Sequence, residues 1–473
     1  MVFPVTGGTQ STGYEISNSV RYNDGDNPSL SRTLGSASGE KVFSFSTWAK
    51  RSTPGGSHSN YLLYGVDGSS NSFNWYFRND ALRLYENTAG SGGAYITTNQ
   101  LFRDVSAWYH VLLVYNTNES TNTNRVKIYI NGSQIAVGDL SVTNWPDEDY
   151  TNAEVVKSGN TMKIGASGSS SEVFDGYLAE TYFIDGQALA PSDFGEFDDN
   201  GVWIPIKYTG TFGNNGMFLE YQQTGTSANA SGIGADTSGN DNHFTPANLA
   251  ALDVTEDTPT NNFATLNSVD HRVEDATLSE GNCKFVGSNG NDGASTSTIG
   301  VTSGKWYAEF KFLNDHKSRV GIIDQTGHLA NGNNVNDGVH YDFTGGYIYA
   351  TLNGTGNDTG NNSTSGGYDV TDGSTNDILG VALDADNEKV LFTLNGTTLG
   401  QEGDGFTNLQ RQNTGETFFF HVRDGSGSGD DEPQIECNFG NAPFSISSGN
   451  TDGKYGNFEY APPSGFYALC TKR

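Results

Sequence analysis

Cysteine and basic residues are scarce in this sequence. Its 473 residues include three cysteines, Cys283, Cys437 and Cys470, with no CxxC pair and no metal-ligand spacing, which excludes a disulfide-based scaffold. Lys and Arg number 25 against 55 Asp and Glu, giving a formal net charge of -30 at pH 7. Nucleic-acid affinity comes largely from cations that displace counterions from phosphates. We therefore expect no direct binding to nucleic acid.

Long apolar runs are missing as well. No run approaches the ~18 apolar residues that are needed to span a bilayer, so no membrane insertion is expected. Residues 1–8 have no basic segment followed by an apolar core, and we predict no signal peptide. These absences fit a protein made in the cytoplasm and released, if at all, by lysis or assembly.

The usual motifs of nucleophilic and metal-dependent enzymes are also absent. There is no Gly-x-Ser-x-Gly elbow, and the eight histidines form no metal or triad pattern. His110 lies between Tyr109 and Val111 in a run that is otherwise apolar, and we predict a core residue rather than a ligand. Residues 384–388 (DADNE) lack the Gly and the distal Glu of a calcium loop, so a hairpin turn is the better interpretation.

Alternating apolar residues closed by Asn-Gly are what the sequence does contain. Val126–Ile130 is followed by Asn131-Gly132, and residues 390–394 are followed by Asn395-Gly396; each run is preceded by a second strand-like run. This is the strongest short-range signal for a β-hairpin. The 61 glycines supply turn chemistry, and 34% hydrophobic residues can bury two or three cores. We predict an all-β protein with one helical turn, at residues 191–197, capped by Ser192.

The predicted fold is two antiparallel β-sandwiches in tandem, a jelly roll followed by a related sandwich. We place them at residues 1–210 and 263–460, joined by a Gly-rich connector at 211–262 and followed by a C-terminal tail at 461–473. The predicted strands are 41–50, 61–64, 73–77, 82–85, 108–115, 126–130, 162–164 and 176–184, then 283–286, 305–312, 319–323, 346–352, 378–383, 389–394, 417–422 and 434–439.

Side-chain parity adds detail to two of these strands. In residues 43–49 one face carries Phe43 and Phe45, and the other is mostly small and polar, which predicts a sheet with one solvated side. Residues 108–115 are apolar on both faces except at His110, which predicts a central strand covered on both sides.

Both units resemble known families. In the first, FSFSTW (43–48), WYHV (108–111), KIYING (127–132), KIG (163–165) and DGYLAE (175–180) follow the order found in concanavalin-A-like domains of the laminin-G or pentraxin type. In the second, GKWYAE (304–309), VGI (320–322), ILGVALD (378–384), CNFG (437–440) and PF (443–444) resemble a SPRY domain. The resemblance implies two sandwiches of related architecture.

The sequence that joins and flanks these motifs is similar to virion proteins of marine tailed bacteriophages. The similarity lies in RYN (21–23), LSRT (30–33), YFIDGQAL (182–189), PSDFG (191–195), DTSGN (236–240), NHFTP (242–246), DTPTNNF (257–263) and PSGFYALCT (463–471). It implies a non-enzymatic structural protein made in the host cytoplasm and displayed on the virion exterior, as a tail fibre or a capsid decoration, that contributes to host attachment. Other virion proteins and further copies of the chain are the expected partners, because appendages repeat around symmetry axes.

Two other functions suit such a sandwich, and the first is glycan cleavage. Retaining hydrolases of this architecture carry a Glu-x-Asp-x-x-Glu motif on a strand, which places both carboxyls on one face, about 5 Å apart. No such run is present; the nearest acidic stretches, residues 147–149 and 430–432, have no strand-like alternation. We therefore predict no catalytic residues and no enzyme activity.

The second is lectin-like binding of host surface glycans. Aromatic side chains near loop tips would stack on sugar rings, and the candidates are Trp75, Tyr76, Trp145 and Tyr150. The alternative for the segment from Trp145 to Tyr150 is packing against a neighbouring domain or subunit.

No cofactor is required by this interpretation, although calcium is a candidate ligand. Asp24, Asp26 and Asp67 lie in turn-like text that could offer clustered oxygen ligands, and laminin-G-like domains often bind calcium. A plain polar turn is the alternative at each of these positions.

Overall fold

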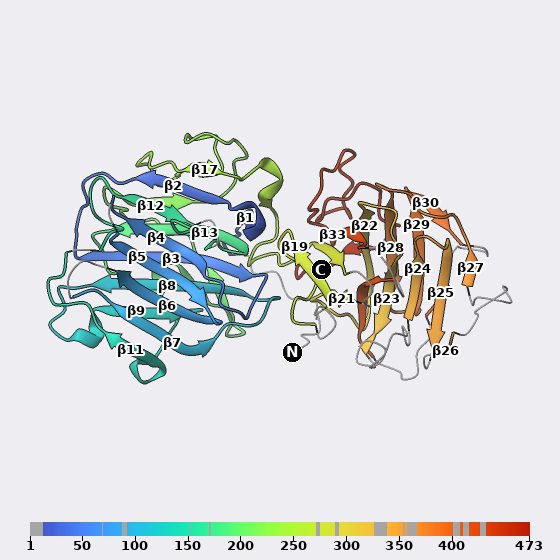
Figure 1. Ribbon diagram of the computed structural model, residues 1–473, viewed down its shortest axis with the longest axis horizontal. Coiled ribbons are helices and arrows are strands. Elements are labelled where there is room, and N and C mark those ends of the chain that lie inside the picture. The colour runs from blue at the N-terminus through green and yellow to red at the C-terminus, as the bar shows by residue number, and fades with distance from the viewer. Residues whose placement is uncertain are drawn as a thin grey trace. The chain divides into compact units, whose positions relative to one another are not determined.

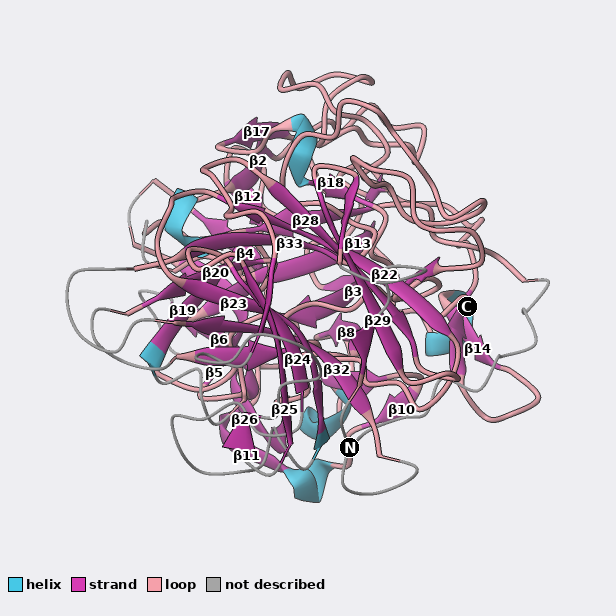
Figure 2. Cartoon of the chain, turned by 90° about the vertical axis from the view of Figure 1, so that its right-hand side faces the viewer, coloured by secondary structure: helices cyan, strands magenta, loops and turns pink. Residues whose placement is uncertain are grey.

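The computed structural model describes residues 13–68, 70–87, 92–151, 153–169, 172–270, 275–288, 293–325, 338–352, 355–356, 367–400, 407–409, 416–425 and 432–473. The chain divides between Asn261 and Asn262 into two compact units, each of which is built from antiparallel sheets (Figure 1). The prediction of an all-β protein with two sandwiches is confirmed. The helical elements with described bounds are single 3-10 turns, seen among the strands in Figure 2: η1 (Asp24–Asp26), η2 (Asn122–Asn124), η3 (Val137–Asp139), η4 (Pro191–Asp193) and η5 (Ala251–Asp253).

The first unit stacks two eight-stranded sheets. In the first sheet the order is β10 (Ser133–Gln134), β9 (Val126–Ile130), β8 (Trp108–Asn116), β3 (Val42–Arg51), β13 (Gly176–Asp185), β1 (Ser19–Tyr22) and β18 (Val254–Thr255), with β16 (Met217–Leu219) beside β13. In the second sheet it is β11 (Leu140–Asn144), β7 (Tyr95–Leu101), β6 (Ala81–Asn87), β5 (Ser72–Arg78), β4 (Asn60–Val66), β12 (Thr161–Ile164), β2 (Ser29–Thr33) and β17 (Thr245–Ala247). A small ribbon pairs β14 (Gly195–Phe197) with β15 (Trp203–Pro205).

The second unit is also built from two sheets. One contains β19 (Ala276–Ser279), β20 (Lys284–Gly287), β33 (Gln434–Asn438), β22 (Lys305–Phe312), β28 (Ile378–Asp384), β29 (Lys389–Leu394) and β30 (Thr397–Leu399), with β31 (Thr407–Asn408) beside β29 and β34 (Tyr467–Ala468) beside β22. The other contains β21 (Ala294–Thr296), β32 (Phe418–Asp424), β23 (Ser318–Asp324), β24 (Gly338–Asp342), β25 (Tyr347–Leu352) and β26 (Thr355–Gly356), with β27 (Gly367–Asp369) beside β25. In the described part of the chain no helix is long and apolar enough to cross a membrane.

Both predicted Asn-Gly turns close hairpins. Asn131 and Gly132 have φ of 47° and 77°, and Asn395 and Gly396 have φ of 50° and 76°. Two consecutive residues with positive φ suit the twist of the flanking strands, and Asn and Gly adopt this backbone at least cost. Each Asn side chain also accepts a hydrogen bond from the neighbouring strand on the other side, from the His110 N–H of β8 (2.8 Å) and the Ile378 N–H of β28 (3.0 Å).

The turn at residues 384–388 is confirmed as the link between β28 and β29, with Asp384 paired to Lys389. At the predicted helical turn, η4 forms over Pro191–Asp193, but Ser192 is not its cap. Instead, the Asp193 side chain accepts a hydrogen bond from the Ala190 N–H at 2.8 Å. The prediction of a Ser192 cap is therefore wrong.

The prediction of a solvated side for residues 43–49 is also wrong. Phe43 and Phe45 enter the core between the sheets, as expected, but Ser44, Ser46 and Trp48 on the other side are buried too. The chain beyond β13 folds back over this side. Its contacts include a hydrogen bond from the Ser44 hydroxyl to the Gln187 carbonyl (2.9 Å). This cover also explains why β8 is buried on both faces, as predicted.

The segment expected to be a connector, residues 211–262, belongs to the first sandwich as far as Asn261. Its strands β16, β17 and β18 pair with β13, β2 and β1. Near its end, Asp257 forms a buried ion pair of 2.8 Å with Lys50 and accepts a hydrogen bond from the Trp108 indole at 3.2 Å. The sequence of this Gly-rich segment did not predict these strands, because each contributes only two or three residues to a sheet.

The expected C-terminal tail is likewise part of the second sandwich. β34 pairs with β22, and Phe466, Ala468 and Cys470 pack in a buried cluster with Tyr307. The Glu309 carboxylate holds the neighbouring segment, because it accepts hydrogen bonds from the backbone N–H groups of residues 459 (2.9 Å) and 460 (2.7 Å).

Candidate functional site

Five tyrosines lie on the outer side of the second sheet of the first sandwich. Alternation places Leu63, Trp75, Leu84 and Ile96 in the core, so their strand neighbours point outward. We call this outer surface the tyrosine face; it is made of Tyr61, Tyr64, Tyr76, Tyr85 and Tyr95.

Three of these tyrosines are packed against one another. Tyr61 stacks on Tyr76 with ring centroids 4.8 Å apart and meets Tyr64 edge to face at 5.8 Å. All three are less than a tenth exposed, and burial raises the pKa of each phenol. They form a rigid base rather than a free surface.

Tyr85 and Tyr95 are different, because each is 37% exposed. They are direct partners in the β6–β7 ladder, and their rings lie edge to face at 5.2 Å. The flanking residues of the same row are Asn74, whose amide donates to the Tyr85 carbonyl at 2.8 Å, and the exposed Asn144, which is paired with Tyr95. The tyrosine pair is thus an exposed aromatic platform that regular strands hold in place, with the exposed Asn144 on one side and the buried Asn74 on the other.

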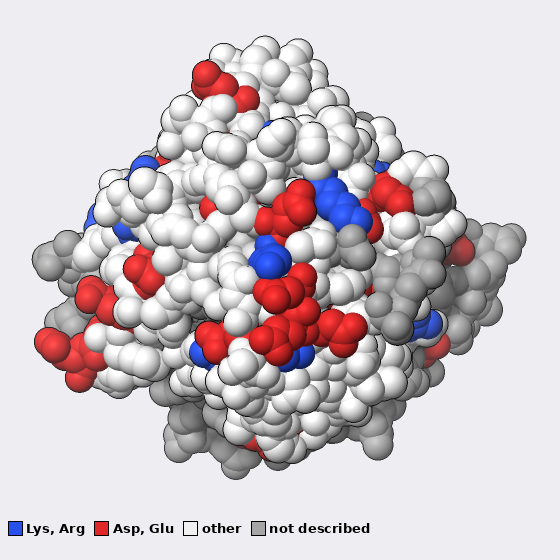
Figure 3. All heavy atoms as spheres, turned by 90° about the vertical axis from the view of Figure 1, so that its left-hand side faces the viewer, with Lys and Arg blue, Asp and Glu red and all other residues white. Residues whose placement is uncertain are grey.

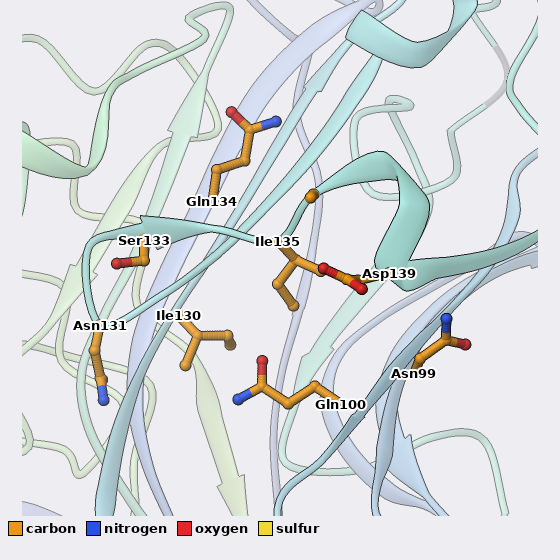
Figure 4. A pocket seen from close by; sticks show the side chains of 9 residues that line it. Asn99, Gln100, Ile130, Asn131, Ser133, Gln134, Ile135 and Asp139 are labelled. Carbon is orange, nitrogen blue, oxygen red and sulfur yellow. The ribbon is translucent and has the colours of Figure 1, made fainter.

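A groove of about 600 Å³ lies at the end of the same unit. Its lining comes from the end of β7, the β9–β10 hairpin and η3: Asn99, Gln100, Ile130, Asn131, Ser133, Gln134, Ile135, Ala136 and Asp139. Figure 4 shows the Ile130 and Ile135 side chains near its middle and the amides of Gln100 and Gln134 on opposite sides. We call it the amide groove, because four of its nine lining residues carry carboxamides.

The floor of the amide groove is fixed by backbone hydrogen bonds. The Asn131 N–H donates to the His110 carbonyl at 2.9 Å, and the Ile135 N–H donates to the Ile128 carbonyl at 2.8 Å. His110 itself is a core residue, as predicted: its Nε2 lies 2.8 Å from the Ser46 hydroxyl, and burial lowers its pKa to about 3. The imidazole is therefore neutral and plays no part in the groove.

The groove lacks the carboxylate pair that glycoside hydrolysis needs. Asp139 is the one carboxylate among its lining residues. Glu86 is a buried carboxyl of the same sheet, and burial raises its pKa to about 7. However, it points into the core, where it accepts hydrogen bonds from the Ala94 N–H (2.7 Å) and the Tyr115 hydroxyl (3.1 Å). Of the other stretches considered, residues 430 and 431 lie outside the described residues.

The aromatic residues predicted to bind sugars are mostly in the core. Trp75 is fully buried between the sheets, Tyr76 is held beneath Tyr61, and Tyr150 is 8% exposed and packs in the main core. The expectation that these three lie exposed near loop tips is wrong, because each fills space in its own sandwich. Trp145 is partly buried and packs against the same core.

The aspartates predicted to bind calcium are engaged in turns. Asp26 in η1 accepts a hydrogen bond from the Asn23 amide at 2.8 Å. Asp67 accepts hydrogen bonds from the backbone (3.1 Å) and side chain (2.7 Å) of Asn71 and so closes the β4–β5 turn. The Oδ2 atom of Asp24 lies 3.8 Å from the Nε2 atom of His58. Where the structure describes the chain, no three His, Cys, Asp or Glu side chains gather as a metal site, and calcium binding stays a prediction.

The predicted sugar-binding residues lie on β5 and after β11, whereas the exposed aromatics lie on β6 and on β7, which was not among the predicted strands. Tyr85 and Tyr95 are the exposed aromatics, and the signal for them was parity. Leu82, Leu84 and Glu86 share one face of β6, which leaves Tyr85 on the other. The amide groove gave no local signal, because its residues come from three separate elements.

Comparison with known proteins agrees with the geometry of the first unit. Residues 24–193 match the family model described as the Concanavalin A-like lectin/glucanases superfamily. No curated protein matches the chain. The first sandwich is thus similar to concanavalin-A-like domains, as its motifs predicted, and this fold is compatible with a non-enzymatic binding module.

Three solved structures are similar in part. The SPRY domain of human HERC1 is 18% identical over 35% of this chain and 94% of its own, with a TM-score of 0.27. A native heptameric SAP-like pentraxin from Limulus polyphemus is 20% identical over 40% and 76%, with a TM-score of 0.25. Domains LG4-5 of the mouse laminin alpha1 chain are 8% identical over 91% and 92%, with a TM-score of 0.31.

Proposed function

We propose that the protein is a non-enzymatic glycan-binding protein whose first sandwich holds uncharged sugars on the tyrosine pair. The observation that carries this proposal is the exposure of Tyr85 and Tyr95, each 37%, as adjacent partners in a regular sheet. Strands hold these rings in place, so binding would cost little conformational entropy in the protein.

The chemistry of the surroundings favours a sugar over other ligands. Aromatic rings offer an apolar surface on which the C–H faces of a sugar can lie, while carboxamides can donate to and accept from hydroxyl groups. Asn144 lies directly beside Tyr95 in the ladder, and Thr97 is the next outward residue of β7. An anionic polymer is disfavoured, because the chain carries a net charge of -30 and acidic side chains gather near the middle of the face in Figure 3.

The carboxylates near the site support binding without cleavage. Asp139 stands alone among the residues of the amide groove, and Glu86 is sealed in the core. We therefore expect bound glycans to be released unchanged, with no cofactor required.

A glycan array tests this function. The wild-type protein should bind a subset of neutral glycans, and Tyr85→Ala and Tyr95→Ala should each lower that binding by about tenfold or more, the loss expected when one stacking contact of ~1.5 kcal/mol is removed. Tyr467→Ala is the matched control, because Tyr467 is a tyrosine of the second sandwich with 38% exposure. Arrays run with calcium and with a chelator show whether glycan binding depends on calcium, which tests the calcium prediction. Absence of binding in both conditions, or cleavage of the glycan, would contradict the proposal.

The biological setting is a second part of the proposal. The phage-like motifs along the chain support a protein displayed on the outside of a bacteriophage particle, in several copies, where it contributes to host attachment. A tail fibre and a capsid decoration both fit. Cryo-electron microscopy of the intact virion should place the chain on an outer surface, whereas its absence from purified particles would reject both roles.

A further inference from the structure

A polar track continues from the tyrosine pair along β7. Tyr95 pairs with Tyr85 on one side and Asn144 on the other, and Thr97 pairs with Arg83 and Ser141. These outward rows follow one another along the strand.

The track ends in the amide groove. Thr98 pairs with Leu140, so the next positions along the two strands are Asn99 and Asp139, and both line the groove. At about 3.4 Å per residue, Asn99 lies roughly 13 Å along β7 from Tyr95. β7 therefore connects the exposed tyrosine pair with the groove, whose opposite side is formed by β9 and β10 of the first sheet. Asn99 is exposed, like Tyr95.

We infer that the ligand is a linear, uncharged oligosaccharide that runs along β7 from the tyrosine pair into the amide groove. This inference rests on the proposed function and names the class of its ligand. Tyr85 and Tyr95 stack on one end of the sugar chain, and Gln100, Gln134 and Asp139 bind the hydroxyl groups of the other end.

The groove has the chemistry for such an end. A carboxamide both donates and accepts, and a carboxylate accepts only, so Gln100, Gln134 and Asp139 together complement hydroxyl groups, which do both. Ile130 and Ile135 between them provide an apolar floor for the C–H face of a ring (Figure 4). No Lys or Arg lines the groove, so nothing there would balance an acidic sugar. These features select an uncharged chain over an anionic one.

The test is the dependence of affinity on chain length. Cello-, laminari-, manno- and malto-oligosaccharides of two to six residues are titrated calorimetrically into the full-length protein. In the series that binds, the hexasaccharide should bind at least about tenfold more tightly than the disaccharide, which reaches only the tyrosine pair.

Variants separate the two ends of the surface. Gln134→Ala should weaken hexasaccharide binding about tenfold and leave disaccharide binding unchanged, which also shows that the variant is folded. Tyr95→Ala should weaken both. Gln223→Ala is the matched control, since Gln223 is an exposed glutamine of the same unit that does not line the groove.

Each outcome has one meaning. Equal affinities for all chain lengths, or a hexasaccharide that is indifferent to Gln134→Ala, would overturn this inference while the proposed function stands. Binding on the glycan array without binding of any oligosaccharide in these series would overturn the inference alone, whereas binding in neither experiment would overturn the inference together with the proposed function.

Discussion

The first sandwich should lose stability as the pH rises from 5 to 8, because burial raises the pKa of three of its carboxyl groups. Burial is the main cause that raises the pKa of Glu86 to about 7, of Asp175 to about 7 and of Glu180 to about 8. A carboxyl whose pKa is raised on folding stabilises the folded state fully below its unfolded pKa, near 4. That contribution is lost as the pH rises through the folded pKa.

One histidine opposes this trend over part of the range. Burial lowers the pKa of His110 from 6.5 to about 3, so its contribution to stability increases as the pH rises toward 6.5 and is constant above it. Each proton that the folded and unfolded states bind differently changes the free energy of unfolding by about 1.4 kcal/mol per pH unit. The loss from the three carboxyls, less the gain from His110, lowers the free energy of unfolding by on the order of 7 kcal/mol between pH 5 and pH 8.

The second sandwich provides an internal comparison. Burial raises the pKa of Glu309 to about 7 and lowers that of His340 to about 3, so the two effects nearly cancel. Its free energy of unfolding should therefore change by less than about 1 kcal/mol over the same range. Differential scanning calorimetry at pH 5, 6.5 and 8 measures both transitions, and hydrogen exchange assigns each transition to its unit.

A single substitution tests the cause. Glu86→Gln resembles the protonated carboxyl, so it should leave the first sandwich unchanged at pH 5 and stabilise it by about 2 to 3 kcal/mol relative to the wild type at pH 8. If the unfolding temperature of the first sandwich is the same at pH 5 and pH 8, or if the Glu86→Gln variant keeps the wild-type pH dependence, buried carboxyls do not control the stability of this unit.

Three further changes have definite expected outcomes. Asp257→Ala leaves the buried Lys50 ammonium without its partner and should destabilise the first sandwich by about 3 to 5 kcal/mol in urea unfolding, much of it restored by adding Lys50→Met; no loss would contradict a buried ion pair. Gly165→Ala places a Cβ 2.1 Å from the Tyr22 ring at φ of 78°, and its melting temperature should fall by several degrees, whereas an unchanged value would mean that the ring has room to move. Asn395→Ala should cost about 1 to 2 kcal/mol in the second sandwich through the lost hydrogen bond and the positive φ, and an unchanged urea midpoint would argue against this turn.

Much of the sheet framework was predictable from local pattern. β3 and β9, like β22, β28 and β29, alternate apolar residues over five or more positions, β8 is an almost continuous apolar run, and the Asn-Gly turns fix where two hairpins close. These signals are local, so a single sequence contains them. Strands of two or three residues, such as β16 and β34, have no period to detect and depend on the sheet they join.

The cover over β3 and the composition of the site were not predictable in the same way. Ser44 and Ser46 suggested a solvated face, but the chain beyond β13 folds back and hydrogen-bonds to Ser44, while Ser46 contacts His110 of β8. Both contacts are long-range. The tyrosine pair could have been found from the parity of β6 and β7. The amide groove could not, because Asn99, Gln134 and Asp139 come from separate elements that only the tertiary fold brings together.

The most direct test is a crystal structure of the full-length protein soaked with the neutral oligosaccharide that binds it best. We expect an intact sugar chain, with a ring at one end against Tyr85 and Tyr95 and its other end in the groove beside Gln134. Density for the sugar on any other surface, or for cleaved products, would contradict it.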